Sequence, residues 1–121
     1  MFRQSKYAID GDSWAIVGGY IEPDEDPHEA AKRELMEETG HEAPHWIPLG
    51  SYAVDANRGF CNAYSFLATN ARKVAEPDAD DLEEYEILAM SKNELTETLG
   101  AGGFKVLPWA AAVSLALPHV D

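Results

Sequence analysis

Polar and apolar positions in residues 27–39 recur with the spacing of an amphipathic α-helix. At 100° per residue, the apolar and small side chains fall on one side, and the glutamates fall on the other within an arc of about 100°. The first side holds Ala31, Leu35, Met36 and Thr39, and the second holds Glu34, Glu37 and Glu38 together with Ala30. The pattern predicts a helix that packs on a sheet through one side and gathers negative charge on the other.

Both ends of this helix are marked in the sequence. Asp26 is a favourable N-cap, Pro27 suits the first helical position, and Glu29 completes a capping box. Gly40 is suited to the left-handed position that follows a helix. These residues predict a helix over residues 27–39.

Shorter alternating patterns predict the remaining elements. The predicted strands cover residues 4–9, 13–17, 46–54, 61–69 and 85–90. A short helix after the N-cap Ser91 and a last helix over residues 104–117, with Pro108 near its first turn, complete the chain. Mixed strands and helices of these lengths predict a single layered α/β or α+β domain over residues 1–121.

Composition limits the class of protein. The chain has 121 residues, 45% of them hydrophobic, which is enough for one domain with a core and too few for two. We expect no membrane span, since no apolar run approaches the necessary ~18 residues. We also expect no signal peptide, because charged residues interrupt the start. The single cysteine, Cys61, excludes an intrachain disulfide and fits a cytoplasmic location.

The net charge of −13 opposes binding to a nucleic-acid backbone, which requires basic patches. It does not oppose a phosphorylated small molecule if a metal ion mediates the contact.

The histidines show no zinc-ligand spacing, and we expect them at the surface. We expect Cys61 to be a small buried strand residue and Trp46 to be a packing residue.

The acidic side of the predicted helix has two interpretations. Glu34, Glu37 and Glu38 repel one another at spacings of three and four residues, and they lie near the helix C-terminus, where the helix dipole disfavours anions. A solvated charged face is the simpler interpretation. Alternatively, a hard divalent cation such as Mg²⁺ offsets the repulsion, with carbonyl groups of the adjacent Gly-rich turn close to the ion.

A longer motif favours the second interpretation. From Gly19 to Gly40 the chain reads G-x5-E-x7-R-E-L-x-E-E-x-G, in which eight defined positions span 22 residues. This segment resembles the Nudix box, the signature of the Nudix hydrolases. His41 departs from the family pattern, which has an apolar packing residue there.

The resemblance implies a fold, an activity and a site. The implied fold is an α/β/α sandwich around a mixed sheet, here shortened at its N-terminus. The implied enzyme hydrolyses the diphosphate of a nucleoside diphosphate linked to another moiety, with Mg²⁺ or Mn²⁺ as cofactor. By similarity, Glu34 and Glu38 are metal ligands, Glu37 is a ligand or supports one, and the Gly18 carbonyl is a further ligand. Glu25 and Arg33 are expected to position the glutamates.

Sequence outside the box resembles the Nudix subgroup that cleaves ADP-ribose and other nucleotide sugars. The "RQ" strand, the short turn before "WAIVGG" and the acidic loop before "YEILAM" carry this resemblance, whereas "VDANRGF" lacks the proline frequent in that subgroup. Glu83 of the acidic loop is expected to help deprotonate water, although a solvated loop is the alternative. Arg3 and Arg58 are assigned to substrate binding, and a strand-end charge is the alternative for Arg3. Other nucleotides, namely dinucleoside polyphosphates and nucleoside triphosphates, remain alternative substrates.

Only 18 residues precede Gly19, fewer than Nudix domains usually have. We therefore expect a missing strand and a homodimer that completes the sheet, since an open strand edge invites pairing. A non-catalytic nucleotide-binding module with the Nudix fold is the alternative from another class. The presence of Glu34, Glu37 and Glu38 favours the enzyme.

Overall fold

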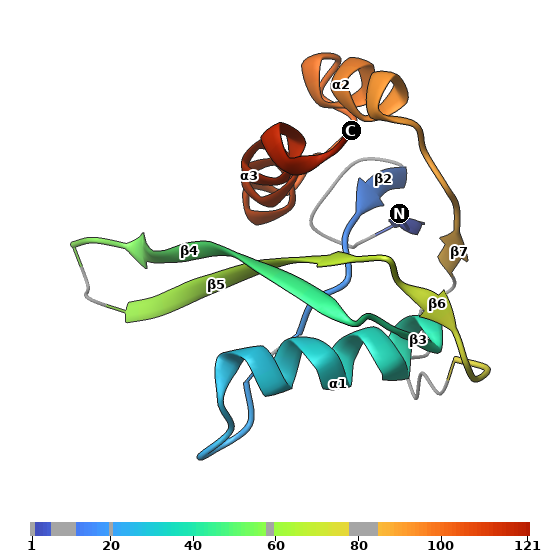
Figure 1. The fold of residues 1–121 in the computed structure, drawn as a ribbon. Helices are drawn as coiled ribbons and strands as arrows, with labels where there is room; N and C mark the ends of the chain where they lie inside the picture. Colours follow the sequence, from blue (N-terminus) through green and yellow to red (C-terminus); the bar gives the residue numbers. More distant parts are fainter. Residues whose placement is uncertain (1, 6–11, 20, 58–59, 78–84) are drawn as a thin grey trace.

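The computed structural model describes residues 2–5, 12–19, 21–57, 60–77 and 85–121. Its largest feature is an antiparallel hairpin of β4 (His45–Asp55) and β5 (Phe60–Thr69). Helix α1 (Pro27–Thr39) lies on one side of this hairpin and α3 (Leu107–Ala116) on the other (Figure 1). The two predicted strands over residues 46–54 and 61–69 are therefore confirmed, and a bulge between Pro48 and Gly50 shifts their register.

Two smaller sheets flank the hairpin. Strand β1 (Phe2–Ser5) lies between β2 (Asp12–Ala15) and β7 (Tyr85–Ile87), and β3 (His41–Glu42) pairs with β6 (Arg72–Lys73). Every pairing among the described strands is antiparallel. The prediction of an α/β domain is confirmed, but the described strands do not form the expected mixed sheet. A short connection such as that between β4 and β5 suits antiparallel neighbours, whereas parallel pairing needs a longer crossover.

Helix α1 begins and ends where the sequence predicted. The Asp26 carboxylate accepts hydrogen bonds from the backbone N–H groups of His28 and Glu29 at 3.0 and 3.2 Å. Gly40 adopts φ 69° and donates its N–H to the Met36 carbonyl at 2.8 Å. The expected reciprocal bond of the capping box is absent from the described cap of α1; the Glu29 carboxylate pairs with Lys32.

The two C-terminal helices differ in how well the sequence predicted where they begin. Helix α2 (Lys92–Gly100) has the complete capping box of Ser91 and Glu94. Helix α3 begins only at Leu107, since the residue before it, Val106, is extended; Phe104, two residues earlier, is buried. A 3₁₀ turn, η1 (Leu117–His119), follows α3. Strand β7 ends at Ile87 rather than at residue 90. No helix in the described ranges has both the length and the apolar content needed to cross a bilayer.

Two side chains lie elsewhere than expected. The His28 ring stacks on Phe66 and meets Trp46 edge-on, each with 5.2 Å between ring centroids. Its Nε2 is buried and has no hydrogen-bond partner among the described residues. The expected surface position of His28 is therefore met only in part, because the first turn of α1 packs on the hairpin and leaves this residue half-buried. Cys61 is exposed rather than buried, in a left-handed backbone conformation with φ 61°.

Candidate metal centre

The acidic side of α1 is covered by the chain that follows β2. The Gly18 N–H donates to Glu38 Oε2 at 3.4 Å. A Cβ added to Gly19 would lie 2.5 Å from Glu34 Oε1, so the glycine backbone lies directly against this carboxylate, and a larger residue would require the end of the Glu34 side chain to shift. Ala30, which the helical pattern places on the acidic side, is correspondingly buried. This side of α1 is therefore a packed site rather than a fully solvated charged face.

Arg33 joins the carboxylates of the site. Its Nε and Nη2 donate to the two oxygens of Glu25 at 2.8 and 3.0 Å, a bidentate arrangement. Its Nη1 donates to Glu34 Oε1 at 3.0 Å and to Glu37 Oε2 at 3.1 Å. One guanidinium thus offsets repulsion among three glutamates and orients Glu34 and Glu37.

The electrostatics of Glu34 differ from those of Glu25. Burial raises the pKa of Glu34 above its ordinary value, the Glu37 charge adds to this rise, and Arg33 opposes it. The Glu34 side chain is only 14% exposed. By contrast, the hydrogen bond from Arg33 lowers the pKa of Glu25. A partly desolvated carboxylate such as Glu34 gains more from a nearby cation than an exposed one, since water screens it less.

The donors of this site fit a hard divalent cation. Carboxylate oxygens of Glu34 and Glu38 and the backbone carbonyl of Gly18 are the kind of ligand that Mg²⁺ and Mn²⁺ prefer. In the ranges that the structure describes, no three His, Cys, Asp or Glu side chains form a metal cage by themselves. A site with one or two carboxylates, completed by water and substrate phosphates, is the usual arrangement for Mg²⁺.

The structure brings together most of the site residues expected from the sequence. Gly18, Glu25, Arg33, Glu34, Glu37 and Glu38 lie in this one centre. Arg3 lies in β1, opposite Trp14 of β2 and Glu86 of β7 in the strand register. Arg58 and Glu83 lie outside the described residues. A glycine-rich turn beside the glutamates was expected from the sequence, but the close contact between Gly19 and Glu34 was not. The consecutive glycines Gly18 and Gly19 are the sequence signal for that contact.

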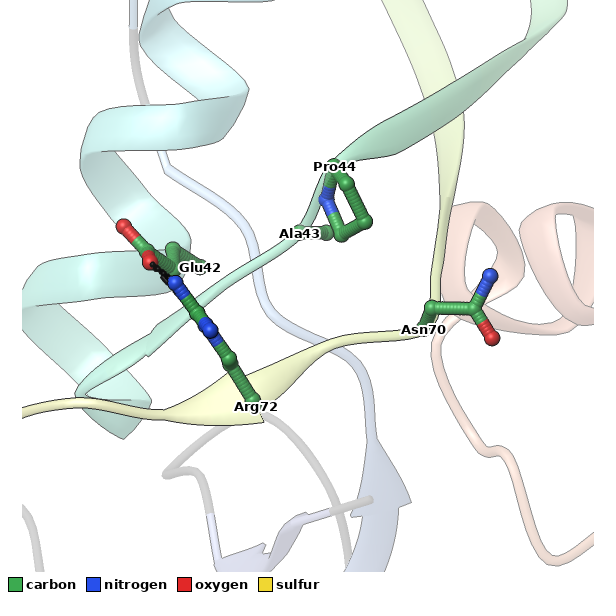
Figure 2. A pocket seen from close by; sticks show the side chains of 5 residues that line it. All are labelled: Glu42, Ala43, Pro44, Asn70 and Arg72. Carbon is green, nitrogen blue, oxygen red and sulfur yellow. Dashed lines mark hydrogen bonds and ion pairs between the residues drawn. The ribbon is translucent and has the colours of Figure 1, made fainter.

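A hollow elsewhere in the fold contains none of these residues (Figure 2). It is lined by Glu42, Ala43, Pro44, Asn70 and Arg72. Inside it, Arg72 donates from Nε and Nη2 to Glu42 Oε1 at 3.2 and 2.8 Å. This exposed ion pair offers no cluster of carboxylates, so the geometry of α1 carries the assignment of the centre.

Comparison with known proteins identifies the family of the chain. The family model of the NUDIX domain matches residues 1–110. The m7GpppN-mRNA hydrolase NUDT17 of Bos taurus is 40% identical over 52 residues, which cover 40% of this chain and 17% of that protein. The chain thus matches less than a fifth of the length of this relative. Since the family model matches nearly the whole sequence, the chain belongs to the Nudix family.

Proposed function

We propose that this chain is a metal-dependent hydrolase that cleaves the diphosphate of a nucleoside diphosphate linked to another moiety, with ADP-ribose or another nucleotide sugar as substrate. The observation that carries the proposal is the convergence of Glu34 and Glu38 on the backbone of residues 18–19, while Arg33 binds Glu25, Glu34 and Glu37. Phosphoryl transfer depends mainly on charge stabilisation and alignment, which such a centre can supply.

Each residue of the centre has a distinct role in this proposal. Glu34, Glu38 and the Gly18 carbonyl hold Mg²⁺ or Mn²⁺, and Glu37 is a ligand or supports one. When bound, the metal neutralises the diphosphate and lowers the pKa of a coordinated water. Arg33 and Glu25 keep the carboxylates in place, with Arg33 fixed by its bidentate pair to Glu25.

The reaction itself adds water to one phosphorus and breaks its bond to the bridging oxygen. The products are two phosphate monoesters, a nucleoside monophosphate and a sugar phosphate. Glu83 is proposed to accept the proton of the attacking water, and Arg3 and Arg58 to bind the substrate. These three roles rest on the resemblance of the sequence to the nucleotide-sugar subgroup.

A second candidate substrate comes from the relative named as an m7GpppN-mRNA hydrolase. A capped RNA also contains a phosphate anhydride joined to a nucleoside. The net charge of −13 disfavours long polyanions, which is why nucleotide sugars remain our first choice. Dinucleoside polyphosphates and nucleoside triphosphates are further alternatives within the same chemistry.

Replacing Glu38 by glutamine tests the centre. Glu38→Gln keeps the shape of the side chain and removes a proposed metal ligand, so we expect kcat/KM at saturating Mg²⁺ to fall by at least about 100-fold. Glu29→Gln is the matched control, because Glu29 is an exposed glutamate of the same helix that pairs only with Lys32 among the described residues. Near-normal turnover of Glu38→Gln would refute the assignment of the centre.

The substrate class is tested by comparing kcat/KM for ADP-ribose, other nucleotide sugars, dinucleoside polyphosphates, nucleoside triphosphates and a short capped RNA at fixed Mg²⁺. We expect a nucleotide sugar to be preferred. A tenfold or greater preference for any other class would contradict the substrate proposal but leave the hydrolase intact. Tight binding of a nucleotide without turnover of any compound would instead identify a binding module.

A further inference from the structure

The far end of the β4–β5 hairpin projects beyond both α1 and α3 (Figure 1). We define the distal hairpin as residues 50–55 and 61–64. Tyr52, Val54 and Tyr64 in this segment are 50%, 59% and 43% exposed. Among the described strands, β4 and β5 pair only with each other, so each has an open edge there. A two-stranded ribbon of this kind is marginally stable in water unless another surface covers it.

The two faces of the distal hairpin are distinguished by the register. Phe66 of β5 stacks on His28 of α1, so this face of the strand is directed toward α1. Tyr64, two residues away, lies on the same face, because side chains alternate along a strand. Tyr52 is opposite Ala63, so Tyr52 and Val54 lie on the other face, toward the side of α3.

Tyr52 is held in place although half of it is exposed. Its hydroxyl donates to the Leu49 carbonyl at 3.2 Å. Its ring lies over Gly50, where an added Cβ would be 2.8 Å from the Tyr52 hydroxyl oxygen. Little side-chain freedom remains to be lost when this aromatic ring is covered, and ordered exposed aromatics are favoured anchors in protein interfaces.

The distribution of charge identifies what can cover this face. Asp55 is the single acid in residues 46–75 and 98–120, although the whole chain has 22 acids and a net charge of −13. These two acid-poor segments contain β4, β5 and α3, and α3 contacts both strands. Two copies of a strongly acidic chain repel at most orientations, and they approach at least cost where both present an acid-poor surface.

We propose that a second copy of this chain packs on the face of the distal hairpin that carries Tyr52 and Val54. A twofold axis places the same patch of each copy against the other, which is the usual geometry of a homodimer. The acid-rich helix α1 of each copy then remains on the far side of its own hairpin. This interface is independent of the hydrolase activity proposed above.

Sedimentation velocity of the full chain over micromolar to submillimolar concentrations tests the interface. We expect a species of about twice the 13.3 kDa chain mass, with a Kd that decreases as NaCl screens the mutual repulsion. Val54→Lys should raise this Kd at least about tenfold, because the twofold axis brings two buried like charges together. The substitution also makes the net charge less negative, which reduces repulsion between the copies, so a general charge effect would lower Kd instead of raising it.

Val74→Lys is the matched control. Val74 is 48% exposed and lies outside the distal hairpin, and the substitution changes the net charge equally. We expect Val74→Lys to leave Kd unchanged, and Val54→Thr, which keeps the side-chain shape, to weaken the dimer less than Val54→Lys. A chain that stays monomeric, or equal Kd values for wild type and Val54→Lys with circular dichroism unchanged, would overturn the proposal. A larger increase in Kd from Tyr64→Lys than from Val54→Lys would place the interface on the opposite face of the hairpin and would also overturn the proposal.

Discussion

Arg33 donates hydrogen bonds to three carboxylates of the centre. Its guanidinium binds Glu25 through two nitrogens and reaches Glu34 and Glu37 through the third. These contacts raise the pKa of Arg33 further above its ordinary value, with the Glu25 hydrogen bond as the main cause. Lysine has the same charge but lacks the planar fork, so it cannot hold three carboxylates in fixed positions.

Replacing the guanidinium of Arg33 has a specific expected result. Arg33→Lys should weaken Mg²⁺ activation by about 10–100-fold, because the carboxylates lose their fixed orientation while the net charge is kept. The measurement is the Mg²⁺ concentration that gives half-maximal activity. Arg72→Lys is the control, since Arg72 also binds a carboxylate, that of Glu42, but lies away from the centre. Equal activation curves for wild type and Arg33→Lys would exclude a positioning role.

At the scale of elements, the C-terminal end of α1 depends on one close contact. Gly40 has φ 69°, and a Cβ built there would lie 1.9 Å from the Ala75 carbonyl oxygen. The Gly40 carbonyl also accepts hydrogen bonds from Val74 and Ala75 at 2.8 and 3.1 Å. The end of α1 is therefore joined to the chain that follows β6, and that junction leaves no room for a side chain.

Substitution of Gly40 should affect stability more than activity. Gly40→Ala is expected to lower the free energy of unfolding by roughly 1–3 kcal/mol, because it combines a left-handed φ with a steric clash. Gly40→Asn should remain destabilising, since asparagine tolerates the φ but still carries the Cβ. Urea denaturation measures both effects. Gly100→Ala is the control, because a Cβ on Gly100, the last residue of α2, meets nothing within 4 Å, and we expect less than about 1 kcal/mol.

At the scale of the whole molecule, charge is distributed unevenly. The acids concentrate in residues 10–42 and 76–97, whereas the segments that form the hairpin and α3 contain almost none. Helix α1 therefore lies within the acid-rich part of the chain, where a bound divalent cation would relieve both local and long-range repulsion.

Binding of Mg²⁺ should accordingly stabilise the fold. At a Mg²⁺ concentration 100 times its Kd, linkage predicts an increase of about 2.7 kcal/mol in the free energy of unfolding. Thermal unfolding with Mg²⁺ and with EDTA measures this difference, and NaCl at equal ionic strength controls for screening. Glu38→Gln should lose most of the Mg²⁺ effect and keep the NaCl effect. Equal stabilisation of both proteins by Mg²⁺ would indicate that the ion acts only by screening.

Local patterns were sufficient to predict several elements of this chain. Helix α1 was predicted over the correct residues because its N-cap, its 3.6-residue period and its left-handed glycine all act within one or two turns. The paired strands β4 and β5 and the N-cap of α2 at Ser91 were predicted for the same reason. The grouping of Glu34, Glu37 and Glu38 also follows from helical spacing alone.

Contacts between distant segments decided what the sequence left open. The burial of Ala30, the approach of Gly19 to Glu34 and the ring contacts of His28 each depend on a segment far away in the chain. The start of α3 at Leu107 likewise accompanies the burial of Phe104, which lies before the helix. The sequence by itself determined the family motif and the helix that carries its charges, because both are local patterns. Only the tertiary structure decided which carboxylates are covered and which hydrophobic surface stays exposed, because packing between distant segments determines burial.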